Sequence, residues 1–383
     1  MSGKVLRTLQ VGNDWFGERE SGLNRFYSEL LKHLPEVGVE VHGMVVGSSN
    51  VRTATGGRIE SFASAKDSVA RRFLGARREA IRFLRAQKPD LIASHFAMYA
   101  FPFLDYLRLT PTVIHFHGPW AAETFAEGRS SWSAKARAAI ERAVYGRGSR
   151  VIVLSKAFGT ELVRRYGVPE ERVRLVPGGI DCERFNDQLT RQQARERLGW
   201  PNDRPIVLSV RRLKRRMGLE NLIDAAKQVS RMMPDVLILL GGTGPIADEL
   251  QARIAEHGLN KTVRLLGRVD DADLPAAYRA ADVSIVPSQS LEGFGLITLE
   301  SLACGTPVLV TPVGGLPEVV QPFAPQCVLS GSSAEIIAEA LQEFLLGKQM
   351  LPGSEECRNY AQGKFSWPVI ARLTRGVYEE ALA

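Results

Sequence analysis

The stretch Pro287-Ser-Gln-Ser-Leu-Glu-Gly-Phe-Gly-Leu-Ile-Thr-Leu-Glu300 decides the fold of this chain. It follows an apolar run, residues 281–287, that has the composition of a buried strand, and it leads into an apolar helix. The predicted order is therefore strand, glycine loop and helix. Glycine lets a backbone approach a ligand closely, and the free N–H groups at the start of a helix attract phosphate.

Two carboxylates, Glu292 and Glu300, flank the glycines of this loop. If the segment between them is helical, its eight steps span about 12 Å. That is the reach of a sugar, a diphosphate and a ribose laid end to end. We expect one carboxylate to hold sugar hydroxyls and the other the ribose diol, with phosphates between them. The alternative is a helix with a polar cap and one exposed glutamate.

Length and composition indicate a globular protein with two hydrophobic cores. The chain has 383 residues, of which 45% are hydrophobic and 24% charged. No N-terminal segment resembles a secretory signal, and no apolar stretch approaches the roughly 20 residues of a membrane span. The four cysteines are scattered, which favours free thiols in a reducing compartment. We therefore expect a cytoplasmic protein.

Residues 66–88 carry eight basic and two acidic side chains, a net charge of +6. Their apolar residues recur every three or four positions, as on one face of a helix, and the arginines occupy the other face. One interpretation is a solvated helix face. The other is docking on an acidic acceptor or on anionic lipid at the inner face of the cell membrane. Nucleic acid is not an expected partner, because no aromatic pattern or known motif accompanies the charge. The residues on the two faces are Val69, Phe73, Ala76, Ala80 and Phe83, opposite Arg71, Arg78, Arg82 and Arg85.

Short apolar runs alternate with helical patterns along the chain, which predicts an α/β fold with parallel sheets covered on both faces. A polar stretch, residues 182–204, interrupts the alternation, so we predict two Rossmann-like domains. The expected strands are 5–11, 39–46, 90–94, 112–116, 150–154 and 173–176, and then 205–210, 236–240, 263–266, 283–286 and 307–311.

The Glu-x7-Glu spacing with Glu-Gly-Phe-Gly inside it resembles the retaining glycosyltransferases of family 4, which have the GT-B fold. Further motifs match in order: Val176-Pro-Gly-Gly-Ile-Asp181, Gly241-Gly-Thr-Gly-Pro245, Leu266-Gly-Arg-Val-Asp270, Ala303-Cys-Gly-Thr-Pro-Val308, Gly314-Gly-Leu-Pro-Glu318 and Phe365-Ser-Trp367. The resemblance implies two Rossmann-like domains that face a central cleft. These are an acceptor-binding domain, 1–190, and a nucleotide-sugar-binding domain, 191–364, with a C-terminal helix, 365–383, that crosses back to the N-terminal domain.

The basic segment that follows residues 205–210 departs from the family pattern. The family usually has Gly-Arg-Leu and then Lys-Gly, and here Arg212 matches the arginine. Arg211 stands in place of the glycine, and Met217 in place of the lysine. We predict that Arg212 and Arg216 neutralise the leaving diphosphate, with Lys214 as the next candidate for the second charge.

The segment Val113-Ile-His-Phe-His-Gly118 reads as a strand that ends at a glycine. Alternation places His115 and His117 on one side of it. By resemblance His117 contacts the transferred sugar, although a core or capping histidine is the alternative, and for His115 a core position is favoured. Gly22 opens the first predicted helix, and the resemblance places it near the diphosphate and the acceptor.

The resemblance implies that the backbone around Arg268 and Val269 meets the nucleobase. It places Gly293, Phe294, Gly295 and Leu296 with the two glutamates in the donor site. Asp271-Ala-Asp273 has the spelling of a metal-binding Asp-x-Asp, but it opens a predicted helix, where acids are favoured. No metal and no cofactor are expected, and the nucleotide sugar is a co-substrate.

The predicted activity is a retaining, metal-independent transfer of a hexose from a UDP- or GDP-sugar to an acceptor hydroxyl. The expected acceptor is a lipid-linked or cell-envelope saccharide, as in polysaccharide or lipopolysaccharide biosynthesis. A small metabolite is the alternative acceptor. Two other classes stay open, a nucleotide-sugar epimerase of the same fold and a non-catalytic sugar-nucleotide binder.

Overall fold

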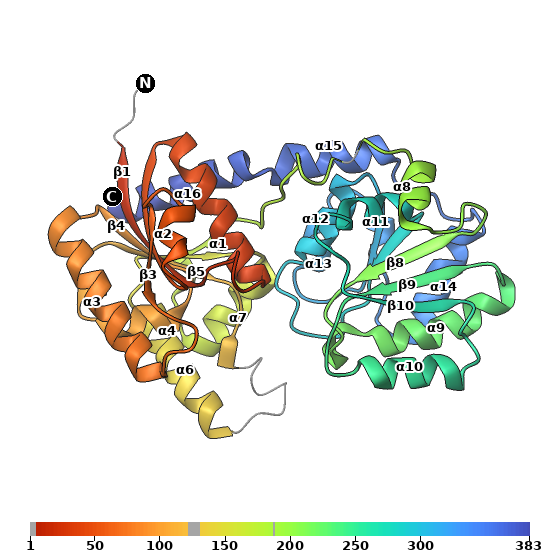
Figure 1. Cartoon of the computed structure of the whole chain (residues 1–383), viewed down its shortest axis with the longest axis horizontal. Helices are drawn as coiled ribbons and strands as arrows, with labels where there is room; N and C mark the ends of the chain where they lie inside the picture. The colour runs from red at the N-terminus through yellow and green to blue at the C-terminus, as the bar shows by residue number, and fades with distance from the viewer. Residues whose placement is uncertain (1–4, 122–130, 187) are drawn as a thin grey trace. The chain divides into compact units, whose positions relative to one another are not determined.

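The computed structural model describes residues 5–121, 131–186 and 188–383. The chain forms two compact units, Met1–Gly179 together with Trp367–Ala383, and Ile180–Ser366. Each unit is a parallel sheet flanked by helices (Figure 1), so the prediction of two Rossmann-like α/β domains is confirmed. The chain changes unit between Gly179 and Ile180, whereas the sequence placed the boundary at residue 190.

The first unit contains a seven-stranded sheet in the order β3-β2-β1-β4-β5-β6-β7, and every pair of neighbours is parallel. The strands are β1 Leu6–Asp14, β2 Val39–Val46, β3 Ile59–Ala63, β4 Leu91–Ser94, β5 Thr112–Phe116, β6 Arg150–Val153 and β7 Val173–Leu175. Strand β3 was not predicted. It lies at the edge of the sheet, where one neighbour is enough, and its sequence Ile-Glu-Ser-Phe-Ala lacks a continuous apolar run.

Helices cover both faces of this sheet, and two separate clusters of buried residues mark the two faces. One cluster includes residues from α3, α4, α6 and α7, and the other includes residues from α1 and α16. The α-helices that the structure describes in the first unit are α1 Gly22–His33, α2 Asn50–Ala54, α3 Val69–Gln87, α4 Ala97–Ala100, α6 Ser131–Tyr145, α7 Lys156–Tyr166 and α16 Trp367–Leu382.

The C-terminal helix α16 belongs to the first unit, as predicted. Its buried residues Trp367, Ile370 and Tyr378 lie in the same cluster as Phe26 and Leu30 of α1. The rings of Phe26 and Trp367 meet edge to face, with centroids 5.3 Å apart. The last helix therefore completes a core whose other buried members lie between Leu6 and Val176.

The second unit contains a five-stranded parallel sheet in the order β10-β9-β8-β11-β12. The strands are β8 Ile206–Val210, β9 Leu237–Gly241, β10 Val263–Gly267, β11 Val283–Val286 and β12 Val308–Val310. The helices are α8 Arg191–Leu198, α9 Leu219–Met232, α10 Ala247–Glu256, α11 Leu274–Ala280, α12 Leu296–Ala303, α13 Leu316–Val320, α14 Ala334–Leu345 and α15 Ser354–Phe365. The stretch predicted as a polar break contains α8, which starts with a capping box between Thr190 and Gln193.

Each sheet reverses its direction of winding at one point, here called its switch point. The switch point lies between β1 and β4 in the first sheet and between β8 and β11 in the second. Loops diverge at the carboxyl ends of the two strands that flank such a point, and ligands of open α/β sheets bind there. His95 follows β4 directly, Arg211 follows β8, and the Glu292 loop follows β11. The fold thus concentrates candidate residues at both switch points.

The basic helix α3 is amphipathic, with one correction to its predicted apolar face. Ala76 and Ala80 are buried, and Phe73 and Phe83 are partly buried. Val69 was assigned to the same face but is 54% exposed, because it is the first residue of the helix and lies outside the contact between α3 and the sheet. Among the described helices, none combines the length and apolar content that crossing a bilayer requires.

Candidate functional site

The loop between β11 and α12 is held in place by its neighbour, the loop before α13. A Cβ at Gly314 would lie 1.9 Å from the carbonyl oxygen of Glu292, and the N–H of Gly315 donates to that oxygen at 3.0 Å. Leu291 adopts a φ of +53°, a left-handed conformation that costs a branched residue about 1–2 kcal/mol. Helix α12 begins only at Leu296, so the assumption of eight helical steps between the two glutamates was wrong.

The two glutamates have different surroundings. Glu292 accepts hydrogen bonds from Nη2 of Arg211 at 2.7 Å and from Oγ of Ser288 at 2.9 Å. Glu300, on α12, is 8% exposed and accepts a hydrogen bond from the hydroxyl of Tyr278 at 3.2 Å. Burial, together with the charge of Glu300, raises the pKa of Tyr278 well above its usual value, so the phenol stays protonated and donates.

The basic loop after β8 contacts the Glu292 loop directly. A Cβ at Gly218 would lie 1.8 Å from the carbonyl oxygen of Pro287, and the N–H of Gln289 donates to the carbonyl of Arg216 at 2.9 Å. Only glycine permits this approach, and the φ of +74° at Gly218 also favours it. The contact brings together the two segments that the sequence assigned to phosphates and sugar.

The arginines of this loop have different roles. Arg212 is exposed, whereas Arg211 is buried against Glu292. Nη1 of Arg216 donates to the carbonyl oxygen of Leu291 at 2.9 Å. Arg215 pairs with Glu220 and Glu249 on the adjoining helices α9 and α10. The sequence overlooked Arg211 as a site residue, because its position suggested only a replaced glycine.

Arg268 and Val269 follow β10, next to the end of β9. The N–H of Gly242 donates to the carbonyl oxygen of Gly267 at 2.6 Å. A Cβ at Gly241 would lie 2.8 Å from Cγ2 of Val269, so Val269 covers the end of β9, while Arg268 is exposed. The predicted donor-site segments from β8, β10 and β11 therefore all lie at the carboxyl edge of one sheet.

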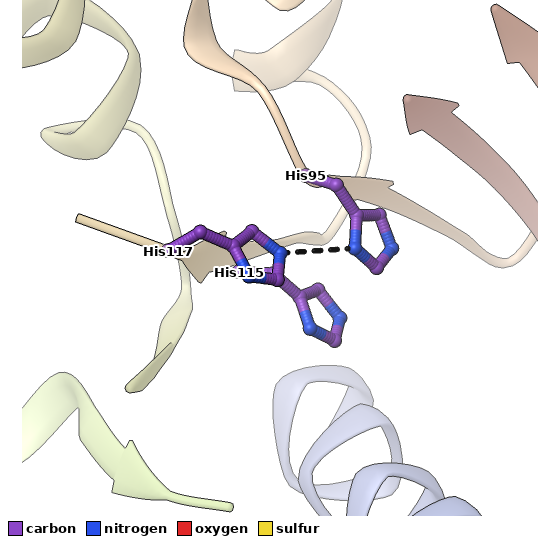
Figure 2. A group of neighbouring side chains, drawn as sticks. All are labelled: His95, His115 and His117. Atoms are coloured by element: carbon purple, nitrogen blue, oxygen red, sulfur yellow. Dashed lines mark hydrogen bonds between the residues drawn. The ribbon is translucent and has the colours of Figure 1, made fainter. Parts of the chain in front are cut away.

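In the first unit, three histidines gather at the switch point (Figure 2). His95 follows β4, His115 lies in β5, and His117 follows β5. Nε2 of His117 lies 3.5 Å from Nδ1 of His95, and Nε2 of His115 lies 3.0 Å from the hydroxyl of Tyr378. The sequence missed His95, although its place directly after a buried strand was a usable signal.

Burial keeps these imidazoles neutral. It lowers the pKa of His117 to about 4, and it lowers the pKa values of His95 and His115 well below their usual range. Neighbouring histidines add to the effect at His95 and His115, since two imidazolium ions would repel each other. His117 can therefore accept a hydrogen bond near neutral pH rather than contribute a positive charge.

One nitrogen of each histidine lies within 4.8 Å of the others, a spacing that raises the question of a metal site. The ring planes are nearly parallel, with angles of 15°, 21° and 13°, and the His95 and His115 centroids are only 4.0 Å apart. A nitrogen lone pair lies in the plane of its ring, so stacked rings do not point at a common ion. The arrangement fits a hydrogen-bonded stack better than a metal site.

The other predicted residues either lie apart from these clusters or have other partners. Gly22 follows the N-cap Ser21, whose Oγ accepts a hydrogen bond from the N–H of Asn24, and space is open where a Cβ at Gly22 would lie. Asp271 pairs with Arg184 at 3.2 Å. Asp273 holds the N-cap position of α11 but makes no capping bond, and its carboxylate pairs with Arg197 at 2.8 Å. The Asp-x-Asp carboxylates thus face arginines.

Fold and site geometry together define a class of protein. Family models match the chain in two consecutive parts, Glycosyltransferase Family 4 over residues 21–184 and Glycosyl transferases group 1 over residues 190–364. The D-inositol 3-phosphate glycosyltransferase of Corynebacterium glutamicum is 30% identical over 320 residues, which cover 79% of this chain and 75% of that protein. The chain belongs to the family 4 glycosyltransferases.

Other relatives match over a shorter region. The D-inositol 3-phosphate glycosyltransferase of Corynebacterium jeikeium is 31% identical over 64% of this chain and 61% of its own length. The matched region thus spans less than two thirds of that relative.

Two solved structures share the fold over nearly the whole chain. One is a sucrose-phosphate synthase from Thermosynechococcus elongatus, with a TM-score of 0.78 and 23% identity over 98% of both chains. The other is Anabaena HepE in complex with UDP, with a TM-score of 0.77 and 18% identity over 98% of this chain and 100% of that one. These similarities establish the GT-B fold.

The neutral histidines determine the sign of a pH effect on stability. An unfolded histidine titrates near pH 6.5, whereas His117 titrates at about 4 in the fold. Between these values the unfolded state binds more protons, so the free energy of unfolding decreases as the pH falls, by up to about 1.4 kcal/mol per pH unit for each such histidine. We expect His117→Asn to flatten this dependence in urea unfolding between about pH 7.5 and 5. The partly exposed His33, changed to Asn, is the matched control, and an unchanged slope in His117→Asn would contradict the expectation.

Proposed function

We propose that this protein is a retaining, metal-independent glycosyltransferase that moves a hexose from a UDP- or GDP-sugar to an acceptor hydroxyl. The observation that carries the proposal is the arrangement at the switch point of the second unit. There the Glu292 loop and the basic loop that contains Arg212 are locked together by the close approach of Gly218 and Pro287. This contact holds carboxylates, which bind hydroxyls, and cations, which bind phosphates, at one edge of the sheet.

We assign the roles along the donor molecule. Glu300 binds the ribose diol, and the backbone near Arg268 and Val269 meets the base. Arg212 and a second cation, for which the sequence nominates Arg216 and then Lys214, hold the diphosphate. The segment that contacts the donor's phosphates and sugar comprises Glu292, Gly293, Phe294, Gly295 and Leu296. For His117 and Gly22 we keep the roles that the family resemblance implies, a contact with the transferred sugar for His117 and a place near the diphosphate and the acceptor for Gly22.

In this mechanism the bond between the anomeric carbon and the leaving phosphate oxygen breaks, and the acceptor oxygen bonds to that carbon on the same face. The acceptor proton passes to the leaving phosphate. Fixed arginines stabilise the developing diphosphate without reorganisation. His117, neutral because burial lowers its pKa, orients a sugar hydroxyl by hydrogen bonding.

For the acceptor we propose a lipid-linked or cell-envelope saccharide, with transfer taking place in the cytoplasm. A second candidate is a small metabolite. It is favoured by the relatives, whose names specify D-inositol 3-phosphate, a small phosphorylated polyol.

The proposal is tested first by thermal shift with UDP, GDP, ADP and their sugars. A ligand at 100 times its dissociation constant adds about 2.7 kcal/mol of stability. The sugar that stabilises the protein is then incubated with candidate acceptors, with and without EDTA. We expect acceptor-dependent release of nucleoside diphosphate that survives EDTA. A changed sugar that keeps its nucleotide would indicate an epimerase, and activity that EDTA abolishes and manganese restores would overturn metal independence.

The different surroundings of the two glutamates predict different losses. Glu300→Ala should weaken binding of the nucleoside diphosphate by about 1.5–3 kcal/mol, because it removes charge-assisted hydrogen bonds to the ribose. Glu292→Ala should leave that affinity close to wild type and strongly reduce turnover, because the carboxylate of Glu292 contacts the sugar rather than the nucleotide. Calorimetric titration and initial rates measure the two effects.

Tyr278→Phe is the matched control for Glu300, because it removes the hydroxyl bonded to this carboxylate but keeps the carboxylate. It should bind nucleoside diphosphate almost as wild type does. Unchanged affinity in folded Glu300→Ala would refute the ribose assignment.

We further propose that α3 docks on anionic lipid. Arg71, Arg78 and Arg85 are exposed, and Leu74 beside them is 71% exposed. Sedimentation with anionic vesicles should show binding at low salt that declines as salt screens the charges. Reversal of Arg78 and Arg82 to Glu should reduce binding, whereas reversal of the exposed Arg231 and Arg264 in the second unit should not. Binding that is absent or insensitive to salt would exclude docking through this helix.

A further inference from the structure

The buried Arg211 has binding capacity that the fold leaves unused. Its side chain is 4% exposed, and its backbone N–H donates to the carbonyl of Gly241 at 2.8 Å. A Cβ at Gly242 would lie 1.8 Å from the carbonyl oxygen of Arg211, so the loop after β9 packs tightly against this residue. Arg211 is therefore held at the switch point between β8 and β11 by its backbone.

One nitrogen of its guanidinium is occupied. Nη2 lies 2.7 Å from Oε2 of Glu292 and 2.8 Å from Sδ of Met217. Within the part of the chain that the structure describes, Nε and Nη1 are buried and have no hydrogen-bond partner. Buried donors are rarely left unsatisfied, and a guanidinium offers its donors in the planar geometry that matches phosphate oxygens.

This guanidinium lies where the basic segment departs twice from the family pattern. Residue 211 carries an arginine where the family pattern has glycine, and residue 217 carries a methionine where it has lysine. The contact between Nη2 of Arg211 and Sδ of Met217 places the guanidinium of residue 211 against the side chain of residue 217. The two substitutions are therefore complementary in space.

Arg216, the candidate from the sequence, has a structural task in the same loop. Its Nη1 donates to the carbonyl oxygen of Leu291, the residue with the left-handed φ of +53°. That bond stabilises the strained turn that presents Glu292.

We propose that Arg211 supplies the second positive charge that binds the diphosphate of the donor, in place of the lysine that the family pattern has at position 217. This inference rests on the proposed function, since it assigns a residue to the same donor site. Nε and Nη1, which are buried in this structure, become available to phosphate oxygens when the loops adjust to the bound donor, while Nη2 keeps Glu292 in position. Arg212 provides the first charge from the exposed side of the loop.

The test compares binding of UDP and of uridine by calorimetric titration to wild type, Arg211→Gly, Met217→Lys and the double variant. GDP and guanosine take their place if the thermal shifts select guanine. We expect Arg211→Gly to weaken UDP binding about ten- to hundredfold, the range for lost hydrogen bonds to a charged group, and to leave uridine binding unchanged.

Met217→Lys alone should not improve UDP binding, because it places a second cation beside Arg211. The double variant should recover most of the affinity, because an ammonium then stands beside Glu292.

Arg215→Ala is the matched control, because Arg215 belongs to the same loop but pairs with Glu220 and Glu249. It should bind UDP as wild type does. Circular dichroism melting verifies that each variant folds. If Arg211→Gly does not fold, Arg211→Met, which keeps much of the volume and removes the charge, carries the same comparison.

Wild-type affinity for UDP in the folded Arg211 variant would overturn the inference and leave the second charge to Arg216 or Lys214. Equal losses for UDP and uridine would also overturn it, because Arg211 would then only maintain the loop. A double variant no better than Arg211→Gly would refute the exchange between positions 211 and 217. If wild type binds no nucleoside diphosphate at all, the proposed function itself fails, so the two failures are distinct.

Discussion

The candidate donor site depends on one close contact between two backbones, that of Gly218 with the carbonyl of Pro287. Because a Cβ at residue 218 would lie 1.8 Å from that oxygen, any side chain there would separate the basic loop from the Glu292 loop. The contact permits the buried ion pair of Arg211 and Glu292. The pair in turn links the two loops through their side chains.

The first unit depends in a similar way on residues far apart in the sequence. The hydroxyl of Tyr378, on the last helix, lies 3.0 Å from Nε2 of His115, and Nε2 of Gln10 lies 3.3 Å from the same hydroxyl. The C-terminal helix therefore does more than cover the core. It supplies a hydrogen-bond partner to His115, a member of the histidine stack, and so connects the stack to the end of the chain.

A common design appears at the two switch points. In each unit a buried polar group follows a strand directly, at residue 95 after β4 and at residue 211 after β8. Burial has different consequences for the two side chains. An imidazole in the protein interior loses its proton and stays neutral, whereas a guanidinium keeps its charge and requires acceptors. The first unit therefore offers neutral hydrogen-bonding groups and the second offers positive charge.

The sequence by itself determined the fold class and most strands, because buried parallel strands are continuous apolar runs and helix periodicity is local. The return of the last helix to the first unit was implied only by the family resemblance, and the structure confirms it. Strands such as Val39–Val46 and Thr112–Phe116 have the predicted bounds. It also pointed to Glu292 and Glu300 through their spacing, whereas Arg212 came from the match to the family pattern. Only the tertiary structure decided that His95 joins the histidines, that α12 starts after Glu292, and that Arg211 reaches both Glu292 and Met217. The contacts of His95 with His117 and of Arg211 with Glu292 join residues 22 and 81 positions apart, and contacts at such separations leave no periodic signal in the sequence.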